Sequence, residues 1–108
     1  MNPIGTWLKG FLTPSQAEAI IAELSDHFGL IKPTGYYVVI ADWRSSSTYG
    51  LYVPEMNELV ISILAPNMRE ALLHEFAHYL AYSRDTAVEA HGEVFQGALS
   101  EVEKACRS

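Results

Sequence analysis

The sequence predicts a small α+β domain in which helices pack on one face of a sheet of about three strands. Capped stretches with apolar residues at helical spacing lie on both sides of region 36–64, and that region holds short runs of β-branched and aromatic residues. The 108 residues suffice for one modest hydrophobic core, so we expect a single domain spanning residues 1–108.

The first helix is expected to begin at Pro14, with Thr13 as its N-cap and Gln16 bonding back to the cap. Gly29 is suited to end it, because glycine readily adopts the left-handed conformation found after many helices. Five apolar residues between these ends share one face of the helix: Ala17, Ile20, Ile21, Leu24 and Phe28. The pattern therefore predicts an amphipathic helix that covers a core.

The middle of the chain predicts three strands separated by turns. Tyr36–Ala41 (YYVVIA) is β-branched and aromatic, which is typical of a buried strand. Thr48–Val53 and Glu58–Leu64 are the expected second and third strands, with Pro54 at the turn between them. We expect Glu58–Leu64 to lie at an edge of the sheet, where its backbone would be free either to bind an extended peptide or to play a structural part alone.

Two more helices are expected in the last third of the chain. Asn67 and Glu70 form a second capping-box pattern, and the helix that they begin should reach about Ser83. A connection over Arg84–Ala90 leads to a last helix at roughly Gly92–Cys106. The apolar face of that helix is Phe95, Ala98, Leu99, Val102 and Cys106.

Charge and cysteine content disfavour several classes of function. The formal net charge is −6 and the seven Lys and Arg residues are scattered singly, so direct binding to nucleic acid or to an anionic membrane is not expected. Cys106 is the only cysteine, which leaves no intramolecular disulfide and no cysteine-rich zinc ribbon. No apolar run approaches the roughly 18 residues of a membrane span, and the N-terminus lacks a signal-peptide pattern. We therefore expect a cytoplasmic protein.

The stretch HEFAH at residues 74–78 carries the chemistry. His74 and His78 are four residues apart on a capped helix, so both imidazoles project from one face and can share one Zn²⁺. Glu75 lies beside the first histidine, where its carboxylate can take a proton from a water that zinc has acidified. The alternative is that both histidines are ordinary core residues; the capped helix favours the metal interpretation.

A catalytic zinc normally has three protein ligands and one open position. The metzincin pattern would require Gly at position 81 and His at position 84, but the chain has Ala81 and Arg84 there. Besides His27 on the first helix, the only other histidine is His91, at the start of the last helix in HGEVFQ.

HEFAH, followed thirteen residues after His78 by H-G-x-x-F-Q, resembles the SprT-like metalloprotease domain found in Spartan-type proteases. The segment STYGLYVPEMNELVISILAP resembles the glycine-containing strand and the following edge strand of that family. The resemblance covers about residues 48–100 and implies a small zincin-like domain with an H-E-x-x-H active-site helix. It also implies a zinc endopeptidase with His74, His78 and His91 as ligands and Glu75 as the general base.

The chain departs from the SprT-like pattern in lacking two kinds of segment, and it also resembles a second family, so alternative functions remain open. Larger relatives carry a zinc ribbon or DNA-binding segments that this acidic chain lacks, so DNA targeting would have to come from a partner. The chain also loosely resembles the ImmA/IrrE-like peptidases, whose third ligand is a glutamate; Glu89 or Glu93 would then replace His91. A zinc-binding interaction module with little turnover is the non-enzymatic alternative. The expected partner of the enzyme is a protein or peptide substrate.

Four tyrosines are candidates for stabilising an oxyanion: Tyr49, Tyr52, Tyr79 and Tyr82. Ordinary amphipathic packing is the alternative, and we favour it for each one.

Overall fold

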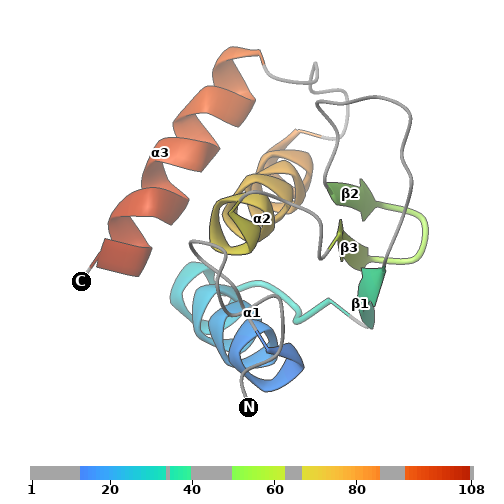
Figure 1. Ribbon diagram of the computed structural model, residues 1–108. Helices are drawn as coiled ribbons and strands as arrows, with labels where there is room; N and C mark the ends of the chain where they lie inside the picture. The colour runs from blue at the N-terminus through green and yellow to red at the C-terminus, as the bar shows by residue number, and fades with distance from the viewer. Residues whose placement is uncertain (1–12, 34, 40–49, 63–66, 86–91, 108) are drawn as a thin grey trace.

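A computed structural model describes residues 13–33, 35–39, 50–62, 67–85 and 92–107. These residues form an α+β domain, as the sequence predicts (Figure 1). The elements are helices α1 (Pro14–Phe28), α2 (Met68–Arg84) and α3 (Glu93–Arg107) and strands β1 (Gly35–Val39), β2 (Gly50–Val53) and β3 (Glu58–Ser62). Helix α2 lies at the centre, in contact with α1, α3, β2 and β3. The outer ends expected for the strands, at Ala41, Thr48 and Leu64, lie outside the described residues.

The strand order in the sheet is β1-β3-β2, with β1 parallel to β3 and β2 antiparallel to it. The expectation that the Glu58–Leu64 strand lies at an edge is therefore wrong, because β3 is paired on both sides. The alternation of side chains along a strand indicates which face of the strand is buried, but it does not indicate which strands pair. Here the parallel pairing of β1 with β3 joins strands that are not consecutive in the chain. Of the described strands, β1 and β2 form the edges.

Strands β2 and β3 are joined by a tight turn at residues 54–57, where Pro54 was expected to break the strand. Asn57 has φ of 51°, the left-handed conformation that asparagine tolerates better than most residues. The Tyr52 hydroxyl donates a hydrogen bond to Oδ1 of Asn57 at 3.1 Å. The turn fixes the antiparallel register that pairs Tyr52 with Leu59 and Gly50 with Ile61.

Helix α1 has the ends that its sequence predicts. The Gln16 N–H donates to Oγ1 of Thr13 at 3.2 Å, and the Thr13 N–H donates to Oε1 of Gln16 at 2.9 Å. Gly29 adopts φ of 67° and ends the helix. At α2, the Asn67 side chain accepts from the Glu70 N–H at 3.1 Å. Local capping therefore sets where both helices begin.

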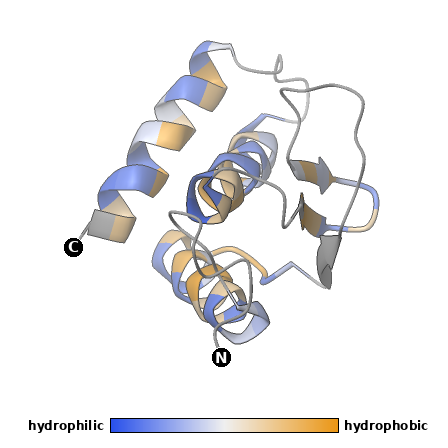
Figure 2. Ribbon diagram, in the orientation of Figure 1, coloured by the Kyte–Doolittle hydropathy of each residue, from blue (hydrophilic) through white to orange (hydrophobic). Residues whose placement is uncertain are grey.

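The core lies between α2 and its neighbours, and Figure 2 shows hydrophobic residues on the sides of the helices that face one another. Its largest fully buried side chains include Ile21 from α1, Leu59 and Ile61 from β3, and Phe76 from α2. On α3 the expected apolar face is confirmed, with Phe95, Ala98 and Val102 buried and Leu99 and Cys106 packed against them. Within the described ranges, none of the helices is long and apolar enough to cross a bilayer.

Candidate metal and catalytic site

Helix α2 carries the three motif residues and runs without interruption through them. The ring centroids of His74 and His78 are 4.9 Å apart, and both side chains are half-buried. A helix brings residues four apart onto one face, so this closeness follows from the spacing alone. Two imidazoles on one face of a helix are candidates for binding one metal ion together.

Helix α3 packs against the same two rings through Phe95. The Phe95 ring centroid lies 4.2 Å from that of His78, with the rings stacked, and 4.9 Å from that of His74. Phe95 itself is 1% exposed. This contact shows that α3 packs against the motif helix at Phe95, and it restricts the orientation of both imidazoles.

Glu75 lies on a different side of α2, against strand β2. Its side chain is only 7% exposed, and burial raises its pKa from 4.5 to about 7. Desolvation raises the pKa because the charged form of a carboxyl loses more hydration than the neutral form. A Cβ added to Gly50 would lie 2.8 Å from Cγ of Glu75 and 2.9 Å from its Oε2. The carboxyl group therefore lies directly on the backbone of β2.

Of the three described tyrosines, Tyr52 packs against Tyr79 and Tyr82, and the hydroxyl groups of Tyr52 and Tyr79 form hydrogen bonds within the domain. The Tyr79 hydroxyl donates to the carbonyl oxygen of Ile31, and the Tyr52 ring lies 5.4 Å from that of Tyr79 and 6.2 Å from that of Tyr82. Burial, reinforced by the neighbouring tyrosines and Glu55, raises the pKa of Tyr52 to about 12. Tyr49 lies outside the described residues.

The donor set in the described residues consists of two imidazoles, and no group of three or more metal-ligating side chains occurs among them. Two of the candidate third ligands, His91 and Glu89, lie outside the described residues. Glu93 is described; it is exposed on the first turn of α3 and forms no such group with the histidines. The chemistry of the set suits zinc, for which imidazole nitrogen is a preferred ligand.

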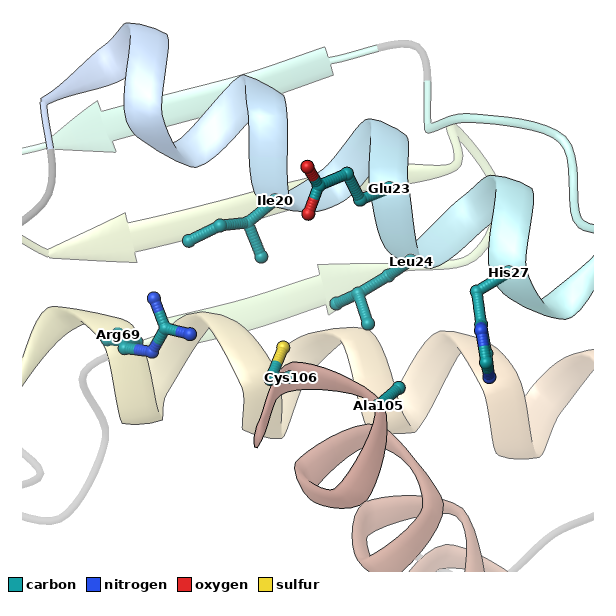
Figure 3. Close-up of a pocket in the computed structure, with 7 residues that line it drawn as sticks. All are labelled: Ile20, Glu23, Leu24, His27, Arg69, Ala105 and Cys106. Carbon is teal, nitrogen blue, oxygen red and sulfur yellow. The ribbon is translucent and has the colours of Figure 1, made fainter. Parts of the chain in front are cut away.

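A separate pocket of about 220 Å³ lies where α1, the start of α2 and the end of α3 meet (Figure 3). It is lined by Ile20, Glu23, Leu24, His27, Arg69, Ala105 and Cys106, and by none of the three motif residues. Burial raises the pKa of the Cys106 thiol, which disfavours a reactive thiolate there. His27, the histidine of α1, is among the residues that line this pocket.

The SprT-like family model matches residues 38–108, well over half of the chain. The chain belongs to the SprT-like family. The match covers α2 with HEFAH, the segment containing His91, and strands β2 and β3. Searches of curated proteins and of solved structures gave no match to the chain. Membership of the SprT-like family is consistent with a metallopeptidase-type domain.

The contact between Gly50 and Glu75 was not predicted from the sequence of this SprT-like chain. One signal existed, because a glycine inside a strand pattern often marks a site where another group approaches the backbone closely. Glycine in the run YGLYV fits that description, but the run does not say what approaches. The burial of Glu75 was missed for the same reason, since it depends on a strand distant in the chain.

Proposed function

We propose that this protein is a zinc-dependent metalloendopeptidase in which His74, His78 and His91 hold the metal and Glu75 is the general base. The observation that carries the proposal is the arrangement on α2, where one helix of a SprT-like chain carries two neighbouring imidazoles and a buried carboxyl group. Structural zinc sites are usually closed sets of four ligands and have no use for such a carboxyl group.

Zinc, when bound, supplies a Lewis acid that polarises a carbonyl group and lowers the pKa of water. The side chains of the protein would transfer the proton and hold the ligands in place. Glu75 would accept a proton from the attacking water and pass it to the leaving amine. Its raised pKa, about 7, suits this role, because a base works best when its pKa lies near the operating pH. Phe95 would hold the two imidazoles in place.

The substrate would be a protein or peptide bound in an extended form. Because β3 is paired on both sides, strand addition would use the edge at β2 instead. Gly50 on β2 touches Glu75, so a peptide paired with this strand would pass close to the carboxyl group. DNA binding, if it occurs, would come through a partner, because the chain carries a net charge of −6. A cytoplasmic location remains our expectation.

Two alternatives concern the metal and its use. Glu89 would be the third ligand if the site followed the ImmA/IrrE-like pattern; the H-G-x-x-F segment favours His91. A zinc-binding module with little turnover would share the ligands but would not depend on Glu75. The presence of this buried carboxyl group favours the enzyme.

Elemental analysis and a cleavage assay together test the proposal. We expect about one zinc ion per purified chain, and a melting temperature that falls when a chelator removes it, because zinc binds the folded site in preference to the unfolded chain. Fluorescein-labelled casein and a panel of DNA-bound proteins would serve as substrates, with cleavage abolished by chelator and restored by added zinc. A protein without transition metal, melting identically in chelator, would refute the metal site.

A further inference from the structure

Strand β2 touches the side chain of Glu75 at Gly50. Gly50 is buried, and Leu51, the next residue, is exposed. Gly50 and Tyr52 lie on the face of β2 that is turned toward α2. Its cross-strand partner Ile61 is also fully buried on the face toward α2. Gly50 is therefore a position of β2 where the backbone itself, without a side chain, meets the Glu75 side chain.

Glycine suits position 50 because there is no room for a Cβ atom there, and not because the backbone has a conformation that only glycine adopts. Of the described glycines, only Gly29 has a positive φ, so the backbone of Gly50 is one that alanine could adopt. A Cβ at Gly50 would nevertheless meet Cγ, Oε2 and Cδ of Glu75 at 2.8, 2.9 and 3.2 Å. Such approaches are far inside van der Waals contact, so the Glu75 side chain would have to move.

The residues around Glu75 leave little space for another conformation of its side chain. The next two residues of α2, Phe76 and Ala77, are fully buried in the core. Glu75 is itself 7% exposed, so its surroundings are already filled on most sides. A glutamate has several staggered rotamers, and the helix alone does not select one of them.

We propose that Gly50 is a positioning residue for Glu75: the bare backbone of β2 at this point fixes where the carboxyl group lies. The contact stands on the geometry of the domain alone, and its consequence for catalysis rests on the proposed function. Any side chain at position 50 displaces the carboxyl group of Glu75 from its place against β2, whereas His74 and His78 pack against Phe95 of α3 and are not contacted by this change.

A double-mutant cycle on the full chain, with zinc added, tests the contact. We expect Gly50→Ala to lower the melting temperature by about 5 °C or more. In a Glu75→Ala background, Gly50→Ala should lower the melting temperature by less than about 2 °C, because the three contacting atoms of Glu75 are absent. In a Glu75→Gln background the full cost should remain, since glutamine keeps a heavy atom at each of those three positions.

Gly97 supplies the matched control glycine. It lies in α3, and a Cβ added there would meet nothing within 4 Å. We expect Gly97→Ala to leave the melting temperature unchanged or raise it, because alanine favours a helix more than glycine does. If Gly50→Ala alone fails to fold, recovery of a folded protein by adding Glu75→Ala supports the contact. Failure of that rescue, or an equal cost in both backgrounds, overturns the inference.

Kinetics separate positioning from a purely structural role. With labelled casein, we expect Gly50→Ala to lower kcat at least about tenfold, while KM and zinc affinity stay within about twofold of the parent. Parental kcat in a folded Gly50→Ala protein would overturn the positioning role. A parent that binds zinc but cleaves nothing would count against the proposed function instead, and the melting cycle would still decide whether Gly50 places Glu75.

Discussion

The two sides of helix α2 that form the candidate site are built in opposite ways. On the histidine side, α3 contributes a large ring, Phe95, which packs against two half-buried imidazoles. On the glutamate side, β2 contributes no side chain at all, and the carboxyl group of Glu75 lies against the backbone at Gly50. One side orients its residues by filling space and the other by leaving space free.

The difference matters because the two sides have different tasks. Imidazoles that bind a metal have to be accessible to it and fixed in direction, which a stacked ring allows. A general base benefits from a dry surrounding, which raises its pKa toward neutrality. Changes on the histidine side should therefore act on metal affinity, and changes on the glutamate side on catalysis and on pH dependence.

The largest expected effect is on the histidine side. We expect His91→Ala to reduce zinc affinity at least as much as His78→Ala, by more than about a hundredfold, because each removes a proposed ligand. Glu89→Ala should cost about tenfold, the low end for a residue that only supports a ligand. Titration of the three variants with zinc against a competing chelator gives the order. Near-parental affinity in His91→Ala together with collapse in Glu89→Ala would assign the third ligand to the glutamate.

On the glutamate side, Glu75→Gln should lower casein cleavage by at least about a hundredfold while zinc content and fold are retained. Glutamine keeps the shape of the side chain but cannot accept the proton. Initial rates and elemental analysis on the same preparation measure the two effects. Cleavage as fast as that of the parent would show that Glu75 is not the base.

The buried carboxyl group should also make stability depend on pH. In metal-free protein, folded Glu75 holds its proton up to about pH 7, whereas in the unfolded chain the pKa is near 4.5. The folded state thus binds more protons over this range, and stability falls as pH rises through it, by at most about 3 kcal/mol.

Glu75→Gln does not titrate and supplies the control. We expect the free energy of unfolding of this variant, relative to the parent, to increase from pH 4.5 to pH 8. Urea unfolding in the presence of chelator measures it at each pH. Parallel curves for the two proteins would mean that Glu75 is not perturbed by burial.

The smallest expected effect concerns the ring that packs on the histidines. Phe95→Leu keeps an apolar side chain in the core but removes the flat surface, and we expect zinc affinity to fall about tenfold, as for other residues that orient ligands. Val102→Ala is the matched control, a fully buried residue of α3 two turns further on. It should destabilise the fold without changing zinc affinity. Equal affinities in both variants would show that Phe95 is only a core residue.

Local patterns in the sequence were sufficient for some elements and not for others. The ends of α1 were predicted because Thr13, Gln16 and Gly29 act on backbone groups within a few residues. The order of the strands was not predicted, because the pairing between β1 and β3 joins segments that are distant in the chain. Alternation of side chains along β3 is the same whether the strand lies in the middle of a sheet or at its edge.

The sequence by itself determined that His74 and His78 stand together, because helical periodicity brings residues four apart onto one face. Only the tertiary structure decided what surrounds them. The ring of Phe95 and the backbone of Gly50 reach α2 from separate elements, α3 and β2. Burial of Glu75, and with it a pKa near neutrality, is a property of that packing, since desolvation depends on every segment that excludes water from the carboxyl group.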